Sequence, residues 1–195
     1  MTVSLVSLWL PVILAAMAVF FASSVIWMAL PIHKNDYHKL GDKENAVMDA
    51  LRSWGLPPGL HMFPMCDPKT MKDNPDAQAK MKSGPWGTIT LMASPPSMGS
   101  CLGMWIVNLV VSSLLIAYVA SISLPAGSSF MNVFRLVATV SLLTFGGSVL
   151  TESIWRGRPW SHAPGALFDA VVYACITGAI FGAMWPAPSG PTLPL

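Results

Sequence analysis

Long apolar stretches and a single polar segment divide this chain. Residues 8–30 and 102–124 carry no charge, and residues 131–150 and 165–185 form two further apolar stretches. Each is close to the roughly 20 residues of helix that cross a bilayer. Backbone groups in lipid must be satisfied within the chain, so all four stretches should be helices. The pattern predicts an all-α membrane protein with four transmembrane helices and a partly helical extramembrane cap between the first and second.

The composition supports this interpretation and excludes other classes of protein. Hydrophobic residues make up 53% of the chain and charged residues only 10%, whereas about 25% of the residues of a soluble domain are charged. A soluble cytosolic enzyme could not cover its surface with so few charges. The formal net charge of +2 gives no broad basic field, so we expect membrane lipid around the chain and no nucleic acid as a partner.

The charges also define the organisation of the chain. Residues 31–100 hold 15 of the 20 formal charges. We therefore expect a first transmembrane helix within residues 1–30, an extramembrane cap over 31–100, transmembrane helices two to four within 101–186 and a Pro-rich tail over 187–195. The first apolar stretch reads as a retained helix, because no Lys or Arg precedes it and it is longer than a signal-peptide core.

The cap should have structure of its own, since 70 residues are too many for a bare connection. Apolar side chains recur at helical spacing over residues 42–54, which predicts an amphipathic helix. A second helix should begin after Asn74, a good capping residue, and end at Gly84. Residues 86–92 have the alternation of an extended segment. We expect the cap to lie against the membrane face and the helix ends.

The basic residues predict an orientation. Eight Lys and Arg residues lie in 31–100 and two in 151–164, while the two chain ends and the turn at 125–129 have none. Loops rich in Lys and Arg stay in the cytoplasm. The cap and the 151–164 loop should therefore be cytoplasmic, and both termini periplasmic.

The cap contains weak candidates for metal ligands, namely His61, Met65 and Cys66. Thioether and thiolate groups favour Cu(I). The spacing matches no Cys-x-x-Cys or His-x-x-x-His pattern, however, and a methionine-rich apolar chain explains the same residues. We expect no cofactor, and whether the cap binds metal stays open.

Four charged residues lie at the inner ends of the third and fourth predicted helices, with the last of them one turn inside the fourth: Glu152, Arg156, Arg158 and Asp169. We expect Asp169 to pair with one of the two arginines and Glu152 with the other. Such a cluster would fix the hairpin between the two helices. The alternative is a proton or ion relay, because ionisable groups within membrane spans commonly serve function.

The fourth predicted helix repeats a small residue at every fourth position, in Ala170, Ala174, Gly178 and Gly182. A face of this kind lets another helix backbone approach closely. It would either pack inside the bundle or bind a partner subunit.

Three stretches of the sequence resemble known proteins: GLPPGLHMFP, MKSGPWGTITLM and SIWRGRPWSHAPGALFDAVVYACITGAIFGAMWP. They are similar to uncharacterised bacterial four-helix integral membrane proteins, over most of the chain. The resemblance implies a bacterial inner membrane location. It transfers no activity and assigns no role to any residue.

No nucleophile elbow, phosphate-binding loop, dinucleotide-binding pattern or zinc-protease helix occurs in the sequence, so we predict no catalytic residues. The first functional hypothesis is a non-catalytic accessory or scaffold subunit of a larger membrane complex, bound to other membrane subunits. The alternative is a small transporter or a copper- or metal-handling membrane protein. A third possibility is a membrane enzyme that uses Asp169, Glu152 and His162.

Overall fold

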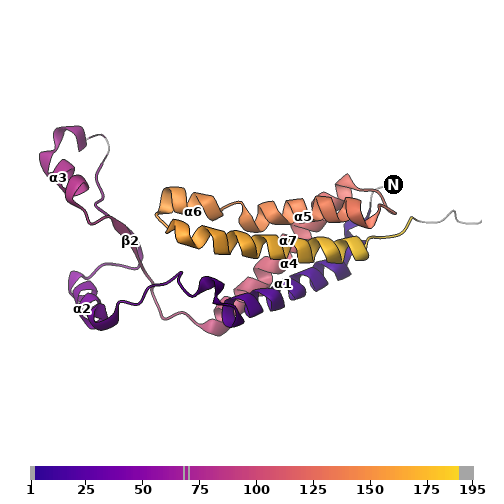
Figure 1. Cartoon of the computed structure of the whole chain (residues 1–195), viewed down its shortest axis with the longest axis horizontal. Helices are drawn as coiled ribbons and strands as arrows, with labels where there is room; N and C mark the ends of the chain where they lie inside the picture. Colours follow the sequence, from indigo (N-terminus) through magenta and orange to yellow (C-terminus); the bar gives the residue numbers. More distant parts are fainter. Residues whose placement is uncertain (1–2, 68, 70, 189–195) are drawn as a thin grey trace, which may run out of the picture.

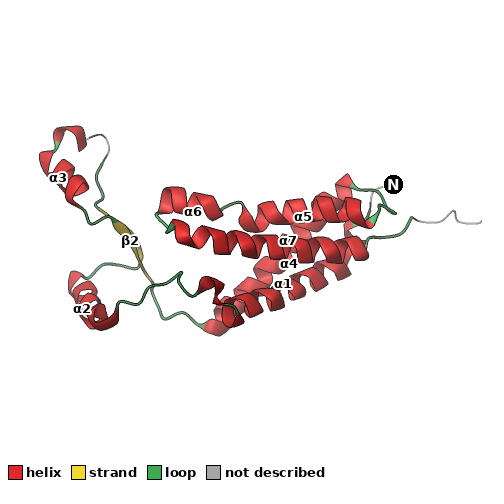
Figure 2. Cartoon of the chain, in the orientation of Figure 1, coloured by secondary structure: helices red, strands yellow, loops and turns green. Residues whose placement is uncertain are grey.

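The computed structural model describes residues 3–67, 69 and 71–188, which are mostly helical (Figures 1 and 2). Four helical segments are long and apolar enough to cross a membrane: Leu5–Ala29, Met98–Ser123, Phe130–Arg156 and Trp160–Ala183. Each overlaps one predicted span, so the prediction of four membrane-length helices is confirmed. Of the predicted tail at 187–195, residues 189–195 lie outside the described part.

Prolines set the limits of the first two long helices. The first is α1 (Trp9–Ala29), and Leu30 after it is extended, as the residue before a proline tends to be. The second is α4 (Met98–Ser123), which ends in the same way at Leu124 before Pro125. Its N-terminus is capped by Ser97, whose side chain accepts a hydrogen bond from the Ser100 N–H.

The third span consists of two helices where the sequence predicts one. These are α5 (Phe130–Gly146) and α6 (Val149–Arg156), with a turn at Gly147 and Ser148 between them. Two successive glycines disfavour an uninterrupted helix, because glycine has a large conformational freedom to lose. The interruption places α6 at the end of the bundle where the polar residues collect.

The fourth span contains α7 (Ala163–Ala183), which lies between α5 and α1 (Figure 1). A side chain at Gly178 would come within 3.0 Å of Ala138 and Phe134 of α5, and one at Gly182 within 2.8 Å of Phe130. Ala170 and Ala174 on the same face are buried as well. The small-residue face is therefore the α5–α7 packing surface of this chain.

The ends of the bundle differ. At one end, the turn between α4 and α5 meets the chain after α7, where the Gly127 N–H donates to the Pro186 carbonyl at 2.8 Å. The start of α1 lies at this end too (Figure 1). The polar segment between α1 and α4 leaves from the opposite end.

The described part of this polar segment contains two short α-helices, two strands and the single-turn 3-10 helices Gly41–Lys43 and Met71–Asp73. The α-helices are α2 (Glu44–Trp54) and α3 (Pro75–Ser83), and the strands are β1 (Gly59–Phe63) and β2 (Gly87–Leu91). The strands pair antiparallel, with Leu60 opposite Thr90 and Met62 opposite Thr88. The predicted helices and the predicted extended segment are confirmed, whereas β1 was not predicted.

The expectation that this segment packs against the helix ends is wrong, and its position against the membrane face stays a prediction. Figure 1 shows α2, β2 and α3 projecting beyond the end of the bundle as an arm, which we define as residues 34–97. Asp36, at the start of the arm, has a side chain that is only 6% exposed, and beyond it no described residue of the arm is buried. The arm holds most of the charges of the chain, and solvation of those charges favours a projecting position over a packed one.

Candidate functional site

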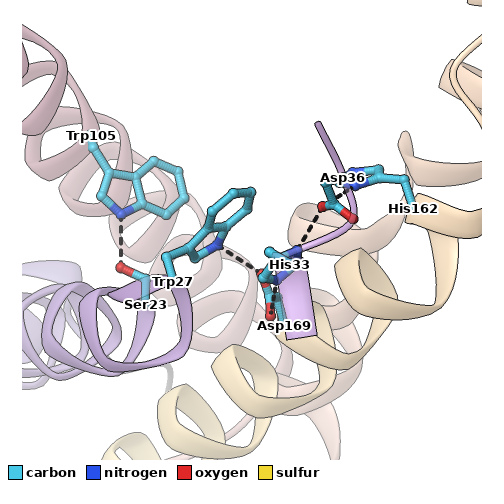
Figure 3. A network of polar contacts seen from close by, with 7 residues as sticks. All are labelled: Ser23, Trp27, His33, Asp36, Trp105, His162 and Asp169. Carbon is cyan, nitrogen blue, oxygen red and sulfur yellow. Dashed lines mark hydrogen bonds and ion pairs between the residues drawn. The ribbon is translucent and has the colours of Figure 1, made fainter. Parts of the chain in front are cut away.

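A buried polar network lies at the arm end of the bundle, where α1 ends and α7 begins (Figure 3). Its central carboxylate belongs to Asp169, on the second turn of α7 and only 6% exposed. His33 closes the short helix η2 (Pro31–His33) directly after α1, and His162 closes η5 (Trp160–His162) directly before α7. The network therefore joins residues that are far apart in the sequence.

Asp169 is held by two aromatic rings. The Trp27 indole N–H donates to Asp169 Oδ2 at 3.1 Å, and His33 Nε2 lies 3.1 Å from the same oxygen. The Trp27 and His33 rings are themselves stacked, with centroids 3.9 Å apart and planes within 3°. A buried carboxylate needs such donors, because an unpaired charge away from water is strongly unfavourable.

Asp36 forms the second half of the network. Its Oδ2 lies 2.8 Å from His33 Nδ1 and 2.6 Å from His162 Nδ1, so two imidazoles converge on one oxygen. The side chains of His33, Asp36 and His162 are 4%, 6% and 10% exposed. His33 consequently bridges the two carboxylates, one with each ring nitrogen (Figure 3).

The hydrogen bonds determine the charge of His33. An ionised carboxylate only accepts, so each ring nitrogen that faces one must donate. His33 faces carboxylates on both sides and is then an imidazolium. Burial would lower the pKa of His33, but its hydrogen bonds to Asp36 and Asp169 outweigh burial and raise that pKa. Burial would raise the pKa of Asp36, and the hydrogen bonds from His33 and His162 outweigh it and lower that pKa.

A second polar contact joins α1 to α4 near the network. The Trp105 indole N–H donates to Ser23 Oγ at 3.1 Å, and the Ser23 hydroxyl donates to the Phe20 carbonyl. Figure 3 shows Trp105 bonded to Ser23, and both Trp105 and Trp27 line the cavity described next. Indoles with satisfied N–H groups supply apolar surface beside the polar network.

A cavity of about 910 Å³ opens beside these residues, among α1, α4, α6 and α7. Its apolar wall includes Met28, Leu102, Phe145 and Val149. Its polar wall includes six residues: Ser23, Glu152, Arg158, His162, Asp169 and Tyr173. Ligand sites in proteins commonly combine this size with an apolar lining and a few converging polar groups.

The predicted charge cluster is only partly assembled. The Arg156 guanidinium donates to Glu152 at 2.7 Å, one helical turn apart on α6. Asp169 pairs with His33 and Trp27 in place of Arg156 or Arg158. Arg158 instead lines the cavity, together with Glu152. His162, Glu152 and Asp169, the three residues of the enzyme hypothesis, thus all border one cavity.

The candidate metal ligands of the arm lie apart from this site. The His61 ring lies 2.9 Å from the Pro57 carbonyl, on strand β1. Met65 and Cys66 line a separate pocket of about 530 Å³ on the arm, which His61 does not border. Among the described residues, the His, Cys, Asp and Glu side chains that converge closely enough for a metal ion are His33, Asp36 and His162.

Sequence reasoning missed the network because its members look unrelated along the chain. Asp36 follows His33 by three residues, and both lie shortly after Pro31, the proline that ends the first span. This His-x-x-Asp at a membrane boundary was the available signal. Its partners, Asp169 and His162, lie more than 100 positions away, and only the packing of α7 against α1 brings them there.

Comparison with known proteins adds no assignment: no family model, no curated protein and no solved structure matches this chain. The function must therefore be argued from the geometry of the chain itself.

Proposed function

We propose that this chain is a non-catalytic multi-pass membrane protein that binds an amphipathic small molecule in the cavity at the arm end of the bundle. The observation that carries the proposal is the cavity of about 910 Å³ with a buried Asp169 carboxylate on its wall. A lipid-like molecule would place its chain against Met28, Leu102 and Phe145. Its polar head would meet the groups around Asp169.

The position of the cavity favours binding over transport. Its lining comes from the last turns of α1, the first turns of α4, the end of α5 with α6, and the first half of α7. All of these lie in the half of the bundle nearest the arm. A transport path would place its polar groups near the midplane of the membrane.

Filling the cavity should abolish this binding. Ala166 lines the cavity, whereas Ala179 is exposed on the same helix and does not line it. We expect purified protein to bind one dansyl-labelled fatty acid per chain in a saturable manner. Ala166→Phe should weaken that binding at least tenfold, and Ala179→Phe should leave it unchanged, as measured by fluorescence titration.

Non-saturable uptake by the wild type would contradict the proposal, because it indicates partition into detergent. Equal affinities of the two phenylalanine variants would contradict it as well. A dansyl-labelled fatty amine in parallel shows whether the site prefers an anionic or a cationic head.

The arm favours a second function, that of an accessory or scaffold subunit in a larger membrane complex. An isolated two-stranded ribbon is marginal in water. In the described part of the chain β1 and β2 have no third strand, and no residue of either strand is buried. One face of this ribbon exposes Leu60 and Met62, which are 62% and 49% exposed. A partner that covers this face would stabilise the ribbon.

A protein partner suits this face better than the lipid surface does. Residues 31–100 carry eight basic and seven acidic side chains, so the segment has almost no net charge. Anionic lipid attracts clusters of Lys and Arg. The occupant we infer is therefore the extramembrane part of another membrane subunit, with an apolar patch opposite Leu60 and Met62.

Site-specific photo-crosslinking in cells tests the accessory function. A photoreactive amino acid at Met62 should capture one membrane protein at high yield. The same group at Met48 or Met81 should not, although these methionines are 43% and 38% exposed on α2 and α3. If the wild type runs as a lone monomer in mild detergent and all three positions label alike, the accessory function is wrong.

We further propose that the protein resides in a bacterial inner membrane, with the arm in the cytoplasm and both termini in the periplasm. The support is the placement of Lys and Arg: ten lie in 31–100 and 151–164, and the eleventh, Arg135, lies near the start of α5. The sequence resemblance noted above supplies the bacterial assignment.

Labelling of Cys66 tests the orientation. With Cys101 and Cys175 replaced by serine, Cys66 on the arm is the remaining thiol. A membrane-impermeant maleimide should modify it in inverted vesicles and leave it unmodified in spheroplasts, with Cys66→Ser as the blank. Modification in spheroplasts would place the arm in the periplasm and reverse the orientation.

A further inference from the structure

The convergence of His33, Asp36 and His162 can be interpreted beyond hydrogen bonding. Each contributes one ligand atom, and these atoms lie within 4.8 Å of one another. The atoms are two imidazole Nδ1 nitrogens and one carboxylate oxygen, supplied by η2, the first residues of the arm and η5. Imidazole and carboxylate are the ligands that first-row divalent cations such as Zn²⁺ accept.

The surroundings of His33 match those of a metal ligand. Metal-bound histidines usually donate their second ring N–H to a carboxylate, which fixes the ring and raises its basicity. The second ring nitrogen of His33 lies 3.1 Å from Asp169, and Asp169 is itself held by the Trp27 indole N–H. Stacking on Trp27 further fixes the plane of the His33 ring.

The charges are also suited to a divalent cation. Asp36 and Asp169 bring two carboxylates into a region where the side chains are at most 10% exposed. One dication bound by neutral histidines would balance both. Access exists as well, because His162 and Asp169 border the cavity.

We infer that His33 Nδ1, His162 Nδ1 and the Asp36 carboxylate form a binding site for one divalent transition-metal ion, Zn²⁺ by ligand class, with Asp169 orienting His33. Atoms that share a zinc ion lie roughly 3–3.5 Å apart. The present separations of 2.8 and 2.6 Å from Asp36 Oδ2 need to widen by less than about one ångström. Three protein ligands leave a fourth coordination position for water or another ligand.

The chain supplies its own matched control for a binding test, because it has four histidines and only two belong to the site. Full-length protein in detergent is stripped with a chelator, equilibrated with ZnCl₂ by dialysis and assayed for bound metal. We expect one Zn²⁺ per chain in the wild type and in the His38→Ala/His61→Ala variant. The His33→Ala/His162→Ala variant should bind none, and Asp169→Asn should lower the affinity about 10- to 100-fold.

Loss of zinc from the His38→Ala/His61→Ala variant would show that the metal binds on the arm, which would overturn the inference. Full zinc occupancy of the His33→Ala/His162→Ala variant would overturn it as well. If the site variant does not fold, NMR of the wild type with ¹⁵N-labelled histidine decides. Zn²⁺ should then shift the Nδ1 resonances of two of the four rings, and unchanged spectra would overturn the site. The measurement needs neither an amphiphile nor a partner, so its failure leaves the proposed functions to their own tests.

Discussion

The structure of the arm end of the bundle depends on one constraint. The negative charge of the buried Asp169 carboxylate must be balanced by a positive charge and by hydrogen-bond donors. Asp169 lies on a membrane-length helix and is almost fully buried. An uncompensated charge there would cost several kcal/mol even after the surroundings relax. His33 and Trp27 supply the compensating charge and donors. Trp27 lies in the last turn of α1, and His33 lies in η2 directly after it. The pairing therefore fixes how the end of α1 meets the start of α7.

The remaining features of the site follow from that junction. Once His33 is held by Asp169, its other ring nitrogen fixes Asp36, the point where the arm leaves the bundle. Asp36 in turn holds His162 and with it the short helix that leads into α7. The cavity borders the same junction, with His162 and Asp169 on its wall. A ligand or metal bound there would contact the residues that position the arm.

The spans and most local elements could be predicted from the sequence because they depend on neighbouring residues. Hydropathy identified the four helices, and Asn74 and Gly84 marked the limits of α3, where the Asn74 side chain accepts from the Ala77 N–H. The split of the third span at Gly147 and Ser148 was not predicted, because the hydropathy of residues 131–150 is continuous across the two glycines. Strand β1 was missed because it depends on pairing with β2, 24 residues beyond its end.

The site itself could not be predicted, because its chemistry arises from tertiary packing. The sequence predicts that Asp169 pairs with an arginine close to it in sequence. In the structure Asp169 pairs instead with His33, which follows α1. The small residues from Ala170 to Gly182 predict a packing face, but they do not show which helix covers it. In the structure α5 of the same chain covers this face. Sequence patterns identify faces and charges, whereas the fold determines which of them meet.

A double-mutant cycle between His33 and Asp169 tests the central claim most directly. The free energy of unfolding of metal-free protein would be measured for the wild type, His33→Ala, Asp169→Ala and the double variant. Compensation of a buried charge predicts that His33→Ala is costly beside Asp169 and much less costly once Asp169 is gone, with a coupling of about 1 kcal/mol or more. Equal costs of His33→Ala in both backgrounds would show that the pair does not hold the junction.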